Sequence, residues 1–224
     1  MHAWLETHSD DSAQNVLRNR IDIYRKTDTN PDRLNPSSIN WRNSEWQILE
    51  KNILDVYVRY KDDIMAFEEE AFSVVKESID RRLERDFKDD SVLKRYHCGA
   101  FRHDIYEADT NIAEFHIANP LRPYSIFDDP LYIPCSFLIL MDHVQARYCA
   151  ESIATASWLN SHPAWLNYFP EEWHSNMDPE TEDIGWGYGI WGQFINARGA
   201  FNDKFGDYFR KHRRFRYYPR YSKV

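Results

Sequence analysis

The sequence predicts an α+β fold, in which an antiparallel sheet (roughly residues 96–141) packs against a long N-terminal helix and several C-terminal helices. Apolar residues recur at spacings of three and four over residues 44–87, as on one face of a helix. Residues 96–119 alternate between apolar and polar, which is typical of strands. Helical patterns return after residue 146, and helices on both sides of a cluster of strands favour an α+β domain.

The N-terminal residues predict a helix over residues 12–26, where Val16, Ile21 and Ile23 lie among charged residues. Two prolines with Asn, Asp and Ser then make residues 27–40 a loop. We expect residues 1–224 to form a single globular domain. Residues 1–43 would be a helical appendage with its linker, and residues 209–224 a basic aromatic tail.

The clearest predicted helix begins at Ser44, which forms a capping box with Gln47. Its apolar stripe runs from Trp46 to Val74, and the helix reaches about Phe87, either unbroken or as two helices separated near residues 61–63. Such a stripe belongs to a core helix or to a dimerising coiled coil. We favour the core helix, because Trp and Tyr fit poorly at coiled-coil seams.

Two alternating segments, 96–106 and 112–119, predict a β-hairpin, and the apolar run at Leu131–Met141 predicts a central strand covered on both faces. Further helices are expected at residues 146–160, 191–198 and 201–211.

The register of the hairpin follows from matching apolar residues. Pairing Ile105 with Phe115 requires a three-residue turn at 109–111 and places His103 opposite Ile117. The other face then holds three pairs, which are Asp104 with His116, Tyr106 with Glu114, and Arg102 with Ala118.

The pair of Asp104 and His116 is the candidate catalytic site. A carboxylate beside an imidazole holds one tautomer and suits the ring to act as a general base. If this face of the hairpin meets water instead, the same residues are cross-strand charge pairs of little energy. His103 lies on the apolar face, and we interpret it as a core histidine and not a ligand.

A polar, proline-stiffened loop, residues 116–129, follows the hairpin. Asn119, Arg122, Ser125 and Asp128 lie within it, and Arg122 could hold a carboxylate or phosphate with two hydrogen bonds. We expect Asn119 or Arg122 to anchor a substrate. The alternative is a connector rich in turns.

A glycine-rich stretch, IGWGYGIWGQF, occupies Ile184–Phe194 and contains a G-x-G-x-x-G pattern. No strand precedes it, and too few residues follow for a strand-helix-strand unit, so we exclude a dinucleotide site. We expect the stretch to form a lid over the core, the wall of an apolar pocket, or both. The predicted substrate-binding residues there are Trp158, Trp186, Tyr188, Trp191 and Gln193.

Cofactor motifs are missing from the sequence. There is no H-x-x-x-H or H-E-x-x-H spacing, and His103 and Asp104 point to opposite faces of one strand, so we expect no metal. Ser157 lacks the G-x-S-x-G elbow of many serine hydrolases. We therefore expect no cofactor of any kind.

Composition narrows the classes of function. Aromatic residues make up 16 % of the chain, which indicates either an aromatic core or a cavity lined by rings. No apolar run is long enough to span a membrane and no secretory signal opens the chain. Three cysteines without C-x-x-C spacing favour a reducing compartment, so we expect a cytoplasmic protein.

Charge is unevenly distributed, with a net charge of −8 and seven Lys or Arg in Phe209–Val224. The acidic body repels nucleic acid, although the basic aromatic tail could stack on single-stranded bases. The tail could equally fold back onto the body, contact a partner, or remain solvated.

The sequence therefore leads to the hypothesis of an enzyme that acts on an apolar or aromatic small molecule in specialised biosynthesis. It would run acid–base chemistry of the isomerase, cyclase or lyase type, with His116 and Asp104 as catalytic residues. The alternative is a non-enzymatic interaction module that uses the long helix and the basic tail, with a homodimer as one form.

Overall fold

The computed structural model describes residues 1–21, 23–29, 41–88, 97–106, 109–181 and 188–224, without the side chains of 87, 105–106, 109–110 and 188. Its contacts divide the chain into two compact units, one within residues 1–90 and one formed by the described residues from 97 onwards. Each unit is described by itself, so the expectation of a single domain stays a prediction. No helix in the described ranges is long and apolar enough to cross a lipid bilayer.

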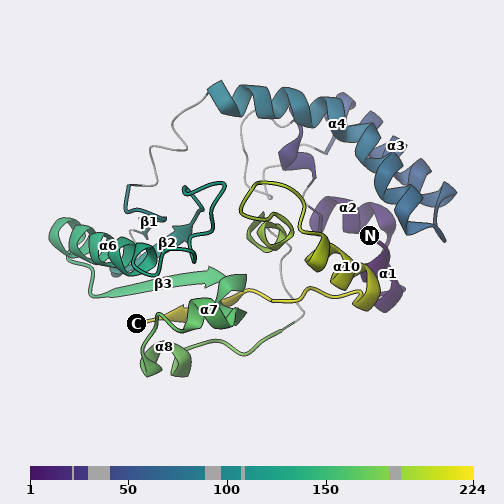
Figure 1. The fold of residues 1–224 in the computed structure, drawn as a ribbon. Helices are drawn as coiled ribbons and strands as arrows, with labels where there is room; N and C mark the ends of the chain where they lie inside the picture. The colour runs from purple at the N-terminus through teal and green to yellow at the C-terminus, as the bar shows by residue number, and fades with distance from the viewer. Residues whose placement is uncertain (22, 30–40, 89–96, 107–108, 182–187) are drawn as a thin grey trace. The chain divides into compact units, whose positions relative to one another are not determined.

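The first unit is helical (Figure 1). The predicted helix over 12–26 is shorter than expected, and the long helix is two helices, as the second alternative required. The elements are α1 (His2–Thr7), α2 (Ala13–Asn19), the short 3-10 helix η1 (Tyr24–Lys26), α3 (Ser44–Arg59) and α4 (Ile64–Lys88).

The start of α3 differs from the predicted capping box. The side chain of Asn43 accepts a hydrogen bond from the Trp46 backbone N–H at 3.0 Å, so Asn43 is the cap and Ser44 is the first helical residue. Asn and Ser cap helices about equally well, and Asn43 and Ser44 are neighbours just before the apolar stripe. The sequence pattern therefore does not distinguish which of the two is the cap.

The apolar stripe is buried inside the first unit. Trp46 and Ile53 of the stripe are buried with Leu17 of α2 and Tyr24, and Leu49, Ala71 and Val74 are partly buried against them. This burial favours the core-helix interpretation over a coiled-coil seam.

The second unit contains a four-stranded sheet in the order β1-β2-β3-β4. β1 pairs antiparallel with β2, β2 pairs parallel with β3, and β3 pairs antiparallel with β4. The prediction of an α+β fold is confirmed, but the sheet is mixed and not antiparallel. The strands are β1 (Phe101–Tyr106), β2 (Asp109–Ile117), β3 (Ser152–Ser157) and β4 (Arg220–Lys223).

The predicted central strand at Leu131–Met141 is wrong, because this segment lies in the helix α6 (Tyr132–Tyr148). A continuous apolar run does not distinguish a strand from a helix by periodicity alone. Leu138 and Ile139 are 64 % and 49 % exposed, so the helix lacks the polar face that would have marked it. Pro134 is compatible with α6 because it lies in the first turn, where the backbone N–H needs no helical partner.

The predicted helix at 146–160 is also wrong, since that range holds the end of α6, then β3, then the 3-10 helix η3 (Trp158–Ser161). The prediction of a helix at 201–211 corresponds to α10, whereas 191–198 is helical only at its start. The remaining elements are α7 (Pro163–Leu166), α8 (Glu171–Ser175), α9 (Tyr188–Trp191), η4 (Gly192–Phe194) and α10 (Asp203–His212).

The basic C-terminal segment is part of the second unit. Phe215, Tyr218 and Ser222 are buried, and β4 adds an edge to the sheet. Of the alternatives for residues 209–224, folding back onto the body is therefore the one observed.

The register of the hairpin differs from the prediction by two residues. His103 lies opposite Phe115 and Asp104 opposite Glu114, with an irregularity between Ile105 and Tyr106. The predicted turn at 109–111 is wrong because Asp109 already belongs to β2. A slip of two keeps every side chain on its predicted face, so the assignment of the two faces holds.

One face of the sheet carries the core of this unit. α6 packs on β1 and β2, as Figure 1 shows, and Phe101 and Phe115 meet Phe137 of α6. Trp165 of α7 and Trp173 of α8 are fully buried in the same cluster. The aromatic residues therefore build a packed core.

Candidate functional site

Strand β1 presents different chemistry on its two faces. Arg102 and Asp104 point to one face and His103 to the other, because side chains alternate along a strand. Each face gathers polar side chains from other elements. Asp104 meets His116 of β2, whereas His103 meets two further histidines.

The predicted pair of Asp104 and His116 is in contact. Nε2 of His116 lies 2.8 Å from Oδ2 of Asp104, although the observed register places the two residues diagonally and not opposite each other. Nη1 of Arg102 donates to both Asp104 oxygens, at 3.2 and 3.1 Å. The Asp104 carboxylate thus forms hydrogen bonds with both the Arg102 guanidinium and the His116 imidazole.

The exposure of this pair decides what it can do. The side chains of His116 and Asp104 are 41 % and 40 % exposed, and that of Arg102 is 23 % exposed. In a neutral His116 ring, donation from Nε2–H to Asp104 leaves Nδ1 as the unprotonated nitrogen. No described residue forms a hydrogen bond with Nδ1. The ring can therefore exchange a proton with a molecule that reaches it from solvent.

The predicted substrate anchors lie after β2 and make no hydrogen bond to this pair. The Asn119 amide donates to the Tyr124 carbonyl at 2.9 Å and accepts from the Leu121 backbone at 3.0 Å. Asp128 accepts from the Ser125 backbone at 2.8 Å. The structure thus uses Asn119 to shape the loop, whereas Arg122 is exposed.

The predicted aromatic wall lies elsewhere in the second unit. The Trp158 ring stacks on Tyr217 with ring centroids 6.1 Å apart, and Trp191 packs against Phe194 and Phe215. Trp186 and the side chain of Tyr188 lie outside the described residues.

Gln193 is 1 % exposed and ties backbone segments together. Its amide nitrogen donates to the carbonyls of Ile190 and Tyr217, at 3.0 and 3.2 Å. Its amide oxygen accepts from the Tyr217 backbone at 3.4 Å. These bonds hold the turn at η4 against the chain leading to β4.

A hollow of about 520 Å³ lies between the end of α6 and β3. None of the predicted site residues lines it, and its described lining holds no aromatic ring. The lining residues are Met141, Val144, Gln145, Cys149, Ala150, Glu151, Ser152, Ile153 and Val224.

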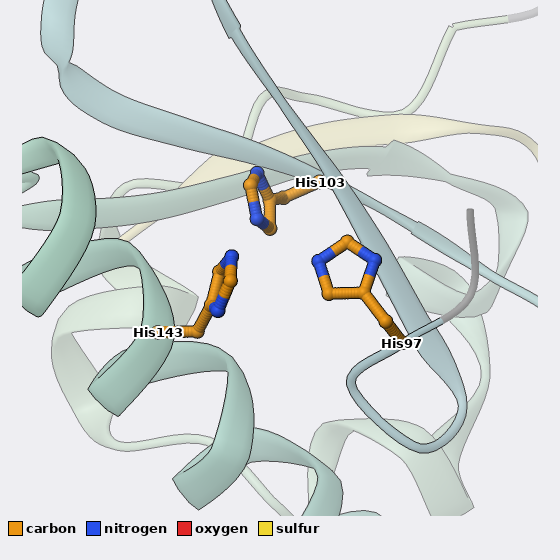
Figure 2. Close-up of side chains that lie close together, drawn as sticks. All are labelled: His97, His103 and His143. Carbon is orange, nitrogen blue, oxygen red and sulfur yellow. The ribbon is translucent and has the colours of Figure 1, made fainter. Parts of the chain in front are cut away.

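The opposite face of β1 holds a cluster that the sequence did not predict. His103 gathers with His97, which precedes the strand, and with His143 of α6, as Figure 2 shows. Ring centroids are 5.3 Å apart for His97 and His103, 4.9 Å for His97 and His143, and 5.1 Å for His103 and His143. One nitrogen from each ring lies within 4.8 Å of the others.

His103 and His143 are half-buried in this cluster, and His97 is exposed. Both ring nitrogens of His103 are buried without a hydrogen-bond partner. Its pKa is lowered, mainly by burial and then by the nearby His143 and His97, so the ring stays neutral at pH 7. His103 lies on the face of β1 that α6 covers, as the sequence predicted. The cluster was missed because His143 follows the predicted strand at Leu131–Met141, and no helix was predicted there to bring it to β1.

Comparison with known proteins adds no relative. No protein-family model, no curated protein and no solved structure matches this chain.

Proposed function

We propose that this protein is an enzyme that moves protons on a small apolar or aromatic molecule, at the pair of Asp104 and His116. The observation that carries the proposal is the hydrogen bond of 2.8 Å between His116 Nε2 and Asp104 Oδ2, on a face open to solvent. A carboxylate that holds an imidazole in one tautomer is a recurrent arrangement for general acid–base catalysis.

The roles follow from the geometry. Nδ1 of His116 takes a proton from the substrate and returns it to another atom, as an isomerase, cyclase or lyase requires. Asp104 keeps the Nε2 proton in place and stabilises the imidazolium that forms. Arg102 holds the Asp104 carboxylate in position through its two hydrogen bonds. Arg122, which is exposed on the loop after β2, would anchor the substrate.

Solvent exchange tests the proposal without knowledge of the net reaction. A proton-transfer enzyme incorporates deuterium from D₂O at the carbon that it deprotonates. A panel of apolar and aromatic carbonyl compounds would be incubated with the protein in D₂O and followed by NMR. We expect exchange with the wild-type protein and its loss in His116→Ala.

The matched control is His174→Ala, which removes an exposed histidine from α8. Exchange should persist in this variant. Exchange at the same rate in wild type and His116→Ala, or no exchange on any compound, would overturn the proposal.

A second candidate function is a protein-interaction module, and the exposed apolar residues of the first unit favour it. Val58 of α3 is 76 % exposed, and Met65 and Phe72 of α4 are 60 % and 55 % exposed. Because the Trp46 to Val74 stripe faces the unit's own core, a partner would have to contact these outer residues instead.

The test of this candidate is the mass in solution of the wild type and of Phe72→Asp, measured by light scattering. A dimer that becomes a monomer in Phe72→Asp supports the module, and a wild-type monomer argues against self-association.

A further inference from the structure

We propose that His97, His103 and His143 form a binding site for a divalent transition metal, with Zn²⁺ as the best-suited ion. This site goes beyond the proposed function, since it lies on the face of β1 opposite to Asp104 and contains none of the acid–base residues. It also differs from our expectation from the sequence, in which no metal was foreseen.

The geometry of the three rings is close to that of a bound state. Zn²⁺ binds imidazole nitrogens at about 2.0–2.1 Å, so tetrahedral ligands lie roughly 3.3 Å apart. The three candidate nitrogens lie within 4.8 Å of one another and face a common space (Figure 2). Side-chain rotations that bring each nitrogen inward by about 1 Å would complete the site.

The fold brings the three ligands together from distant parts of the sequence. His97 directly precedes a tight turn, in which Cys98 and Phe101 exchange backbone hydrogen bonds of 3.1 and 3.0 Å. The Ala100 backbone N–H donates to the Ser136 hydroxyl of α6 at 3.1 Å. This bond fixes the turn, and with it His97, against the helix that carries His143.

Gly99 allows that close approach. It has φ +63°, and a Cβ atom there would lie 2.2 Å from Oγ of Ser136. Only glycine fits both the backbone conformation and the space. The close contact between this turn and α6 therefore depends on glycine at position 99.

His103 supplies the chemical argument. Buried polar atoms almost always have partners, yet both ring nitrogens of His103 lack one in the described structure. A metal ion would bind one of them. A neutral imidazole coordinates a metal through its unprotonated nitrogen, although the charge of the nearby Arg147 makes a bound cation less favourable.

The ligand set narrows the choice of ion. Within the described residues the cluster contains imidazoles without carboxylates or thiolates. Imidazole suits zinc, copper and nickel, whereas calcium and magnesium require oxygen ligands. Three protein ligands also leave a fourth position for water or a substrate, as in catalytic zinc sites.

The test is titration of the metal-stripped full-length protein with Zn²⁺, followed by calorimetry and by the melting temperature. We expect one Zn²⁺ per chain and a rise of several degrees in the melting temperature at saturation. Co²⁺ in place of Zn²⁺ should give the strong visible absorption of a four- or five-coordinate ion.

Each of His97→Ala, His103→Ala and His143→Ala should weaken Zn²⁺ binding at least tenfold. His97 is exposed, so its removal should leave the fold intact by circular dichroism and keep the test valid if His103→Ala fails to fold. His174→Ala should bind Zn²⁺ as the wild type does. Absence of binding, or unchanged affinity in His97→Ala and His143→Ala, would overturn the proposal.

Discussion

His116 Nε2 hydrogen-bonds Asp104 Oδ2 at 2.8 Å across two strands, from diagonal positions in the ladder. Both side chains are about two-fifths exposed, so the bond adds little to stability. We expect His116→Ala to change the free energy of unfolding by less than about 1 kcal/mol. Urea denaturation of His116→Ala, Asp104→Ala and the double variant would measure this energy. A loss of about 3 kcal/mol would show that the pair is structural.

The turn before β1 depends on Gly99. Gly99→Ala should destabilise the second unit by about 2 kcal/mol or more, because left-handed backbone costs other residues about 1–2 kcal/mol and Ser136 must also move. Gly189→Ala is the matched control, since a Cβ there meets nothing within 4 Å. Thermal melts of both variants check the prediction. Equal melting temperatures would contradict it.

Arg18 and Glu50 form a largely buried ion pair in the first unit. Arg18 Nε and Nη2 lie 2.5 and 2.6 Å from the two Glu50 oxygens, and the Glu50 side chain is only 5 % exposed. Arg18→Met leaves a buried carboxylate without its cation, so we expect a loss of about 3 kcal/mol in the free energy of unfolding.

The control for the Arg18 variant is Lys51→Met, which removes an exposed ion pair with Asp55 on the same unit. Its expected cost is below about 0.5 kcal/mol. Chemical denaturation measures the free energy of unfolding of both variants. Similar losses would show that the burial of Glu50 does not determine how much its ion pair with Arg18 contributes to stability.

The stability of the second unit should fall as the pH drops below about 6.5, the ordinary pKa of histidine. Burial lowers the pKa of His103, with His143, His97 and Arg147 acting in the same direction and Asp104 against it. Burial, and then Arg216, also lowers the pKa of His162. Below about pH 6.5 these two histidines therefore bind protons more readily in the unfolded chain than in the folded chain, which favours unfolding.

Urea denaturation between pH 8 and pH 5 measures this dependence. His103→Gln should lose less stability than the wild type as the pH falls, because it lacks one of the two histidines whose pKa is lowered by folding. Identical slopes would mean that His103 accepts a proton as easily in the folded as in the unfolded protein.

The sequence predicts the parts of the fold whose patterns are local. The apolar spacing after Ser44 predicts α3 and α4, and the alternation around His103 and His116 predicts β1, β2 and their two faces. The pairing of Asp104 with His116 follows from that alternation, because a register slip of two residues preserves the faces.

The remaining parts depend on contacts between distant segments. α6 is apolar on its exposed side as well as on its buried side, so Leu131–Met141 carries no helical period. β4 comes from a basic segment whose charges resemble those of a solvated tail. The cluster of His97, His103 and His143 depends on both the turn at Gly99 and the helix α6, and spacing alone does not predict it.

The tautomer of His116 tests the central claim most directly, and long-range ¹H–¹⁵N NMR of the histidine rings reports it. Our account predicts that the neutral form of the ring carries its proton on Nε2, held by Asp104, and leaves Nδ1 bare. Asp104→Ala should mix the two tautomers. A proton on Nδ1 of the neutral ring in the wild-type protein would contradict the account, because that nitrogen could not act as the base.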